Sequence, residues 1–598
     1  MGSAAEVGRD FHGDARLFRL AWIAVAVGLL GTCTAYVLIH AIWFFTNLFF
    51  FQTLSDRNVS PALNHLGAWV VVVPVLGGLV VGWMARFGTA QIRGHGIPEA
   101  IESILFGKSV VSPKVALLKP VASGIAIGSG GPFGAEGPII MTGGAIGSLL
   151  AQFFHLTAGE RKALLVAGAS AGMTAIFGTP IAAVLLGVEL LLYELRPRSL
   201  LPVGVACAVA GFLRPVLIDS GPLFPLTTQP LRPLGLLSCV FAGLLCGAIS
   251  WLLSNSLYRI EDLFHRLPVH WMWWPAIGGL FVGLGGLLEP RALGVGYDVI
   301  RDLLQGHLAR DLIVGLLLAK AAMWLIALGS GTSGGVLAPL LMLGAGVGAF
   351  LAPYLPGGSP AIWPLVFMAA TLGGTMRAPL MAVVFAFELT HDADSLLPVL
   401  AASIVAYAFT VLTMGRSILT EKIARHGHHT FSEFGTDPLE RHTVSEVMTT
   451  GPTSIEATSD IAEALGSHFG NRPTDRSLPV TRDGVLIGMA DRSALLNAPR
   501  SVVQVDALFG SVEPLVALAS ETCRSVAARL AVHGLDSLPV VEDFASMRLV
   551  GMVSRGDLIQ ATAGIHAEEH ERQTVRRLGI RERDSALRRD PKFRKVRS

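Results

Sequence analysis

Charged side chains are scarce in this sequence of 598 residues. Lysine, arginine, aspartate and glutamate make up only 15% of it, whereas apolar residues make up 52%. An average soluble domain carries about 25% charged residues, so this chain cannot cover a water-facing surface of its full size. Much of the surface is therefore expected to face a lipid bilayer, and we predict an integral, multi-pass membrane protein.

Cysteines are also few, and their spacing excludes two further classes. The five cysteines form no CxxC pair, and no HExxH motif occurs, so neither a disulfide framework nor a metal site is predicted. Four of them (Cys33, Cys207, Cys239 and Cys246) lie in apolar runs and are expected to be small buried hydrophobes. The net charge is only +2, and no basic stripe precedes the last thirty residues, which argues against a nucleic-acid partner.

Long apolar runs fill the first two thirds of the chain. Residues 17–51 are almost uniformly apolar and exceed the length of one crossing, which predicts a long or tilted helix. Several later runs are shorter than the roughly 20 residues of a full crossing and contain Gly or Pro, which indicates a protein-lined cavity. They lie near 67–86, 115–127, 138–155, 162–192, 200–218, 233–255, 271–289, 312–328, 335–353, 361–375, 379–390 and 396–414.

The changes in composition predict the domain boundaries. A polar N-terminal segment (1–16) precedes a membrane domain (17–425), a linker (426–442), two soluble α/β units (443–500 and 501–564) and a charged tail (565–598). The tail is expected to be a solvated helix that frays. Basic residues at Arg9, Arg16, Arg19, Arg196 and Arg198 predict that both termini are cytoplasmic, as in a protein of the cell (inner) membrane.

An internal repeat is the most informative feature of the apolar part. Residues 128–151 (GSGGPFGAEGPIIMTGGAIGSLLA) align without gaps with residues 329–352 (GSGTSGGVLAPLLMLGAGVGAFLA), with ten identities. A second pair, 179–190 and 378–389, has nearly the same offset and aligns Glu189 with Glu388. Gly-rich membrane segments resemble one another by composition, but two co-linear matches favour a true repeat.

Paired segments broken by Gly and Pro point to the substrate site of a transporter. Pro suits the first turn of a helix, so each repeat is predicted to start a helix inside the membrane. The free N–H groups and the positive end of the helix dipole then attract an anion without a full positive charge. Residues 128–138 and 335–339 contain neither Lys nor Arg, which supports an anion held by backbone dipoles and still able to leave.

Three motifs carry a resemblance to a known family: 94–98 (GHGIP), 134–138 (GAEGP) and 335–339 (GVLAP). In this order they resemble the motifs of the CLC family of chloride channels and chloride/proton antiporters. The resemblance implies an all-α multi-spanning membrane domain with an inverted internal repeat. It also implies a homodimer in the lipid bilayer with one pathway per subunit for chloride or a similar small anion, and protons as further partners in the antiporters.

The resemblance assigns Glu136 as the gating glutamate. A carboxylate among helix N-termini competes with the anion for the same dipoles, and protonation would release the site. The alternative is a structural glutamate that caps a helix. The resemblance further implies anion binding by the main chain of Val336 and Leu337, and by the loop of His95, Gly96 and Ile97.

This sequence departs from the family pattern at three side chains of the anion site. His95 replaces a serine, Leu337 replaces a phenylalanine, and Leu419 stands where the family carries a tyrosine. His95 could donate a hydrogen bond, act as a cation or be a polar loop residue. These changes leave the identity of the anion open, so a fluoride or nitrate carrier of the same fold is the alternative to a chloride transporter.

Proton coupling is also open. The candidate proton path consists of Glu136, Glu189 and Glu194. Many antiporters of the family have adjacent glutamates near 189, but here Leu190 follows Glu189, and leucine cannot carry a proton. Glu194 lies about one turn further on, although its neighbour Arg196 favours a simple surface ion pair. A channel, an uncoupled transporter and an antiporter with another proton route all remain.

Residues 443–564 resemble a tandem pair of CBS domains, a small soluble α/β fold. The stretches 486–495 (LIGMADRSAL) and 549–558 (LVGMVSRGDL) repeat each other, each after a Ser-Leu-Pro-Val segment. Such pairs often bind adenine nucleotides, which the resemblance would place at Ser554 (phosphate) and Asp557 (ribose). In the first unit Asp491 and Ala494 stand at these places, so that half-site is expected to be weak or empty. A purely structural dimerisation module is the alternative, and no cofactor is certain.

Two other classes compete with transport. A membrane-embedded serine protease would fit the GxSxG stretch around Ser170, but no later His lies in the middle of an apolar span to act as a base. Small residues that pack one helix against another explain this stretch better. A pure nucleotide sensor would not need two anion-directed helix starts. We therefore do not expect an enzyme.

Overall fold

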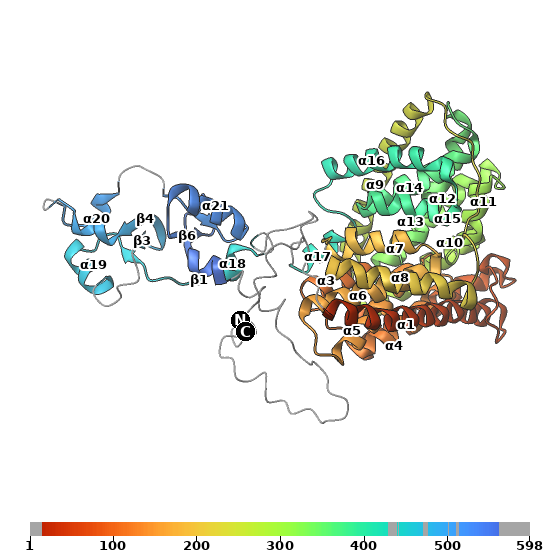
Figure 1. The fold of residues 1–598 in the computed structure, drawn as a ribbon, viewed down its shortest axis with the longest axis horizontal. Coiled ribbons are helices and arrows are strands. Elements are labelled where there is room, and N and C mark those ends of the chain that lie inside the picture. Colours follow the sequence, from red (N-terminus) through yellow and green to blue (C-terminus); the bar gives the residue numbers. More distant parts are fainter. Residues whose placement is uncertain are drawn as a thin grey trace. The chain divides into compact units, whose positions relative to one another are not determined.

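The computed structural model describes residues 15–195, 197–427, 439, 442–469, 477–499, 502–509 and 514–560. The expected N-terminal segment, Arg196, most of the linker and the charged tail lie outside these ranges. The described residues fall into two compact units, one before residue 429 and one after it. The first is helical and the second contains two small sheets (Figure 1), so the expected fold class is confirmed.

The first half of the membrane unit contains eight helices within the described residues. It occupies the lower part of this unit in Figure 1, in red to yellow. The helices are α1 (Ala15–Thr46, with a π-helical turn Asn47–Phe51), α2 (Val72–Phe87), α3 (Ile97–Leu105), α4 (Pro113–Gly128), α5 (Glu136–Gln152), α6 (Ala158–Phe177), α7 (Pro180–Leu186, with a π-helical turn Gly187–Leu192) and α8 (Pro197–Leu217).

The second half repeats this order and adds one short helix. Its helices are α9 (Gly235–His265), α10 (Trp274–Leu288), α11 (Tyr297–Gln305), α12 (Arg310–Gly329), α13 (Leu337–Leu351), α14 (Trp363–Met376), α15 (Pro379–Thr390), α16 (Leu396–Thr413) and α17 (Thr420–Arg425). Helices α1 to α8 thus correspond to α9 to α16, and α17 follows at the end of the unit.

Contacts between α2 and α10 show that the two halves are related by a pseudo-two-fold axis. A Cβ atom on Gly78 would lie 2.3 Å from the carbonyl oxygen of Pro275, and one on Gly279 would lie 2.3 Å from that of Pro74. Each residue and its counterpart are 201 positions apart, so the contact is reciprocal. Only glycine permits this approach, which brings the two helices together backbone to backbone.

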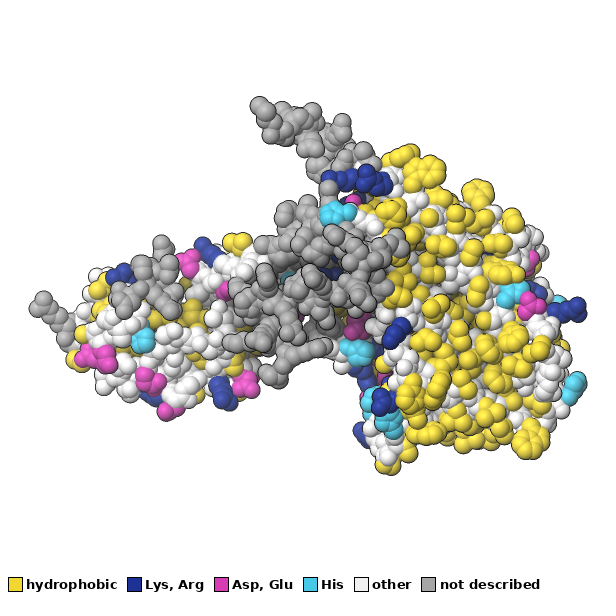
Figure 2. Space-filling view, turned by 90° about the horizontal axis from the view of Figure 1, so that it is seen from below, with side chains coloured by type: hydrophobic (Ala, Val, Ile, Leu, Met, Phe, Trp, Pro, Cys, Tyr) yellow, Lys and Arg dark blue, Asp and Glu magenta, His cyan; other side chains and the backbone are white. Residues whose placement is uncertain are grey.

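The outer surface of the membrane unit is apolar. Eight of its described helices are long and apolar enough to cross a membrane, and large apolar side chains such as Phe212 and Leu412 are 85% exposed. Figure 2 shows apolar side chains across one face, with charged residues and histidines gathered near its edges. Such a surface suits lipid rather than water.

Most expected segments form helices, but four details differ. The run 162–192 is divided because Gly178 ends α6 with a φ of +72° and Pro180 starts α7. The expected segment 233–255 belongs to α9, which continues to His265. The short helices α3 and α11 were not expected as membrane elements. Cys33 is exposed rather than buried, whereas the other four cysteines are buried.

The second unit contains two sheets of the order β1-β7-β6-β5 and β2-β3-β4. Strands β6 and β7 pair antiparallel, as do β3 and β4, so the two repeated sequence stretches form equivalent hairpins. The elements are α18 (Val444–Val447), β1 (Thr449–Thr450), β2 (Ile455–Glu456), α19 (Ile461–His468), β3 (Ser477–Arg482), β4 (Val485–Asp491), α20 (Arg492–Leu496), β5 (Ala517–Leu518), α21 (Cys523–His533), β6 (Ser537–Val541) and β7 (Leu549–Ser554).

Candidate functional site

The two Gly-rich loops of the repeat meet in the interior of the membrane unit. The amide of Gly335 donates to the carbonyl of Gly134 at 2.9 Å, and the amide of Gly134 donates back at 3.4 Å. These two glycines occupy the same position of the repeat. The reciprocal pair brings the starts of α5 and α13 together, so the backbone N–H groups of both helices converge on one place.

Glu136 occupies this place. It is the first residue of α5 and is completely buried. Its Oε1 atom accepts a hydrogen bond of 2.5 Å from the amide of Ala338, in the first turn of α13. Its Oε2 atom has no hydrogen-bond partner among the described residues. The carboxylate therefore binds where an anion would find the N-terminal amides of α13, with one oxygen left unsatisfied.

Only glycine fits at these two loop positions, because the carboxylate of Glu136 occupies the space in which a side chain would lie. A Cβ atom on Gly134 would lie 1.7 Å from Oε2 of Glu136, and one on Gly335 would lie 2.2 Å from the same oxygen. Both distances are far below van der Waals contact. Side chains at either position would therefore expel the carboxylate from its site.

The start of α3 packs against the start of α5. Gly96 has a φ of +90°, and a Cβ atom on it would lie 2.2 Å from the carbonyl oxygen of Gly137. A Cβ atom on Gly137 would lie 1.7 Å from the carbonyl oxygen of His95. His95 is buried, and its Nδ1 has no partner among the described residues. Ile97 is the first residue of α3 and is completely buried.

An ion pair connects α3 to the last helix of the unit. Glu99 accepts a hydrogen bond from the amide of Gly96 at 2.8 Å and binds Nζ of Lys422, on α17, at 2.5 Å. Leu419, immediately before α17, is completely buried. Helix α17 thus follows Leu419 and is tied to the loop that contains His95.

The other anion-binding residues expected from the sequence lie at the start of α13. Val336 is the N-cap of this helix and Leu337 is its first residue, and both are completely buried. The structure therefore brings Glu136, Val336 and Leu337 together at the paired helix starts. His95 and Gly96 join them through the contact with Gly137.

Two buried lysines hold the loops before α3 and α11. Nζ of Lys119 donates to the carbonyls of Ile92 at 2.8 Å and Gly94 at 3.1 Å. Nζ of Lys320, which is 201 positions later, donates to those of Ala292 at 3.1 Å and Gly294 at 2.7 Å. Both side chains are completely buried. Each ammonium group thus satisfies backbone carbonyls that would otherwise be unpaired.

Glu189 and Glu388 each bind the start of the helix that belongs to the other. Glu189 accepts a hydrogen bond from the amide of Met381 in α15 at 2.8 Å. Glu388 accepts from the amides of Ile181 and Ala182 in α7 at 3.0 and 2.8 Å. Each carboxylate therefore stabilises a helix N-terminus through charge and hydrogen bonds. Glu189 itself lies in the π-helical turn that follows α7, and its hydrogen-bond partner is the start of α15 and not a residue around Glu136.

Glu194 lies in a different setting from the surface pair expected for it. It accepts a hydrogen bond of 2.7 Å from the hydroxyl of Ser199, and Nζ of Lys162 lies 3.8 Å away. The side chains of Glu194 and Lys162 are only 14% and 13% exposed. The pair is therefore largely buried, and Arg196 lies outside the described residues.

Ser170 packs in the way expected of a small residue in a membrane helix. It is completely buried, and its hydroxyl has no partner among the described residues. Around it α6 approaches α5 closely, because a Cβ atom on Gly168 would lie 2.1 Å from the carbonyl oxygen of Gly143. No base is therefore bonded to this serine within the described part of the chain.

In the second unit, Ser554 and Asp557 bind each other at the start of a helical stretch. The amide and the hydroxyl of Ser554 both donate to Oδ2 of Asp557 at 2.8 Å. At the matching place in the first unit, Asp491 accepts from the amide of Ser493 at 3.0 Å. Both arrangements are N-caps, and only the second unit combines a hydroxyl with the carboxylate.

Sequence reasoning missed three features of this site. All three join segments that are distant in the sequence. They are the buried lysines at 119 and 320, the reciprocal hydrogen bonds of Glu189 and Glu388, and the ion pair of Glu99 with Lys422. A signal exists for the lysines, since a lysine inside an apolar run is rare and these two are separated by the repeat offset of 201 residues.

The family described as voltage gated chloride channel matches residues 77–411 of this chain, and the CBS domain family matches 444–501 and 510–564. The chain is 30% identical over 423 residues to the voltage-gated ClC-type chloride channel ClcB of Salmonella typhimurium, covering 69% of this chain and 100% of that protein. It is 28% identical over 378 residues to the H(+)/Cl(-) exchange transporter ClcA of Citrobacter koseri, covering 59% of this chain and 78% of that protein.

Among solved structures, a slow cyanobacterial Cl-/H+ antiporter has the same fold, with a TM-score of 0.61 and 22% identity over 69% of this chain and 98% of the other. The family match covers more than half of the present sequence, and ClcB is covered over its whole length. The chain therefore belongs to the CLC family of voltage-gated chloride channels and related anion transporters, with two CBS domains after its membrane unit.

Proposed function

We propose that this protein transports chloride across the membrane through a pathway gated by Glu136. The supporting observation is the hydrogen bond from the amide of Ala338 to the carboxylate of Glu136. A carboxylate that binds the N-terminal amides of α13 excludes an anion from them. Protonation removes its charge, so the anion can then compete for the same donors.

The surroundings of Glu136 favour passage over permanent binding. The donors at the starts of α5 and α13 are backbone amides, which hold an anion without a full positive charge. The two buried lysines use their ammonium groups on carbonyls of the neighbouring loops. The proposed lining of the anion site consists of Val336, Leu337, His95, Gly96, Ile97 and Leu419.

Chloride flux without obligatory proton exchange is the form of transport that we favour. The apolar residue Leu190 is 4% exposed, and Glu189 accepts an amide hydrogen bond at the start of α15. Neither supplies a free protonatable group for an internal proton path. Proton-coupled exchange is the second candidate, because Glu194 is a largely buried carboxylate and the relative from Citrobacter koseri is named a H(+)/Cl(-) exchange transporter.

The substitutions at His95 and Leu419 make fluoride or nitrate the alternative substrates. The further elements of the proposal are a homodimer with one pathway in each subunit, both termini in the cytoplasm, and domain boundaries at residues 17–425 and 443–564. We also propose that Ser554 and Asp557 bind the phosphate and ribose of an adenine nucleotide that regulates transport.

The test is a flux measurement in liposomes. The purified full-length protein is reconstituted, and chloride efflux and external pH are recorded together for the wild type, Glu136→Ala and the control Glu463→Ala. Glu463 is exposed on α19 of the soluble unit. We expect chloride efflux without a change of external pH in the wild type. The rate of efflux should differ from that of the wild type in Glu136→Ala and not in Glu463→Ala. Proton movement driven by a chloride gradient would establish exchange, and absence of flux for chloride, fluoride and nitrate would refute the proposal.

A further inference from the structure

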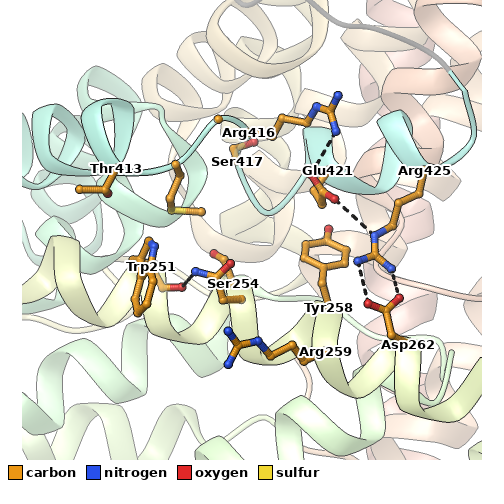
Figure 3. Close-up of a pocket in the computed structure, with 13 residues that line it drawn as sticks. Trp251, Ser254, Tyr258, Arg259, Asp262, Thr413, Arg416, Ser417, Glu421 and Arg425 are labelled. Carbon is orange, nitrogen blue, oxygen red and sulfur yellow. Dashed lines mark hydrogen bonds and ion pairs between the residues drawn. The ribbon is translucent and has the colours of Figure 1, made fainter.

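A polar cavity lies in the membrane unit, and Glu136 and the anion-site residues named with it do not line this cavity. It has a volume of about 290 Å³ and lies between α9 and the segment that joins α16 to α17. Ser254, Tyr258 and Arg259 line it from α9, and Arg416, Glu421 and Arg425 line it from the other side (Figure 3). The second of these walls leads into α17, the last helix of the membrane unit.

One wall of this cavity is held by interactions among its own residues. Arg425 binds Asp262 at 2.5 Å and Glu421 at 3.4 Å, and its guanidinium lies 4.7 Å from the ring centre of Tyr258. The hydroxyl of Tyr258 donates to the carbonyl of Ile418. Figure 3 shows these side chains pointing toward one another. Their polar groups are therefore already paired and form the frame of the cavity.

Other residues that line the cavity have hydrogen-bond donors that are not used by the described residues. Ser254 is 2% exposed, and its hydroxyl has no hydrogen-bond partner among the described residues. Within the same part of the chain, Arg259 makes no ion pair, and Arg416 forms an ion pair with Glu421 alone, at 3.5 Å. Buried hydroxyls without partners are uncommon in proteins. A hydroxyl and two guanidinium groups around one cavity are suited to an anionic group with several oxygens.

The cavity borders an apolar surface of the kind that faces lipid. Trp251 and Leu252 on α9 are 41% and 56% exposed, and Leu412, near the end of α16, is 85% exposed. Trp251 also lines the cavity. Arg259 lies near the end of α9, and tryptophan and arginine together are typical of the level at which lipid headgroups lie. Basic pockets between membrane helices are a known setting for acidic lipid headgroups.

We propose that this cavity binds the phosphate group of an anionic phospholipid. Arg259 and Arg416 pair with the phosphate oxygens, and Ser254 donates its hydroxyl. The acyl chains lie along the apolar surface of Trp251, Leu252 and Leu412. This surface favours a lipid over a soluble phosphate compound, because a soluble compound has no acyl chains to pack against it.

Native mass spectrometry of the purified full-length protein tests the proposal. Phosphatidylglycerol and phosphatidylcholine with the same acyl chains are added in equal amounts, and the lipid retained on the protein is counted. The wild type should retain phosphatidylglycerol preferentially. Arg259→Gln combined with Arg416→Gln should reduce this retention by about tenfold. Arg291→Gln is the control, because Arg291 is exposed in the connection between α10 and α11 and carries the same charge.

Two further variants keep the test independent of folding defects. Arg259→Gln alone changes an exposed side chain and should lower lipid retention partially. Ser254→Met fills the cavity while every arginine stays in place, and it should lower retention as well. Unchanged retention in the double variant would overturn the proposal. Loss of phosphatidylglycerol on addition of inorganic phosphate alone would also overturn it, since the site would then select phosphate and not a lipid.

Discussion

The carboxylate of Glu136 and the amide of Ala338 are joined by a hydrogen bond of 2.5 Å, although 202 residues separate them in the sequence. The bond connects the start of α5 to the start of α13, the two equivalent helices of the repeat. The acidic side chain of one half thus binds the positive helix end of the other. An anion that passes through this place has to replace the carboxylate.

The reciprocal contacts of Glu189 and Glu388 predict a loss of stability when either charge is removed. Glu189→Gln and Glu388→Gln should each lower the free energy of unfolding by about 1–2 kcal/mol, because each weakens a charge-assisted bond at a helix N-terminus. Thermal midpoints in detergent measure the effect. Asp311→Asn, exposed in the first turn of α12, is the control and should change the midpoint less. A loss confined to one glutamate would contradict the symmetric role.

Gly137 is predicted to tolerate no side chain. Gly137→Ala places a Cβ atom 1.7 Å from the carbonyl oxygen of His95, so α3 and α5 must separate. We expect chloride flux to fall by about tenfold or more, since a displacement of about 1 Å at a functional site is costly. Gly315→Ala, in α12 with open space around it, should keep wild-type flux. Wild-type flux in Gly137→Ala would show that this contact does not position the anion site.

Lys119 and Lys320 are predicted to be structural supports of the two loops. Lys119→Met and Lys320→Met each leave buried carbonyls unpaired, at a cost of about 1–3 kcal/mol per group. Both variants should therefore unfold at lower temperature in detergent. Lys114→Met changes an exposed lysine of the same helix as Lys119 and should not. Unaltered thermal midpoints for both buried lysines would refute this assignment.

The soluble unit is predicted to bind an adenine nucleotide at Asp557 and not at Asp491. Equilibrium dialysis of the full-length protein with radiolabelled AMP measures this. Asp557→Ala should weaken binding by about tenfold, through the lost hydrogen bonds to ribose, and Asp491→Ala should leave it unchanged. Equal effects of the two substitutions would exclude an asymmetric site. Absence of AMP binding in the wild type would favour a structural module.

The repeat in the sequence was sufficient to predict helices that begin near 138 and 335, close to the observed starts at Glu136 and Leu337. Proline and glycine act locally there, so their positions can be read from the chain itself. The short helices α3 and α11 escaped prediction because nine residues cannot cross a bilayer, and their burial depends on the surrounding helices.

Contacts across the pseudo-two-fold axis were the least predictable part. Nothing near Glu189 in the sequence indicates that its partner is the amide of Met381, because that bond requires α7 and α15 to lie side by side. The polar environment of Glu194 has the same origin, since Lys162 reaches it from α6. Such pairs follow from the tertiary packing, and the repeat offset gives only the positions at which to look for them.

The most direct test of the proposed competition is whether an anion or the carboxylate of Glu136 occupies the N-terminal amides of α13. Crystals of the wild type and of Glu136→Ala are grown in bromide, and the anomalous scattering at the Ala338 amide is measured. We predict a bromide ion at this amide in Glu136→Ala and none there in the wild type, where the carboxylate holds the position. Bromide at this amide in both proteins, or in neither, would contradict the competition between Glu136 and the transported anion.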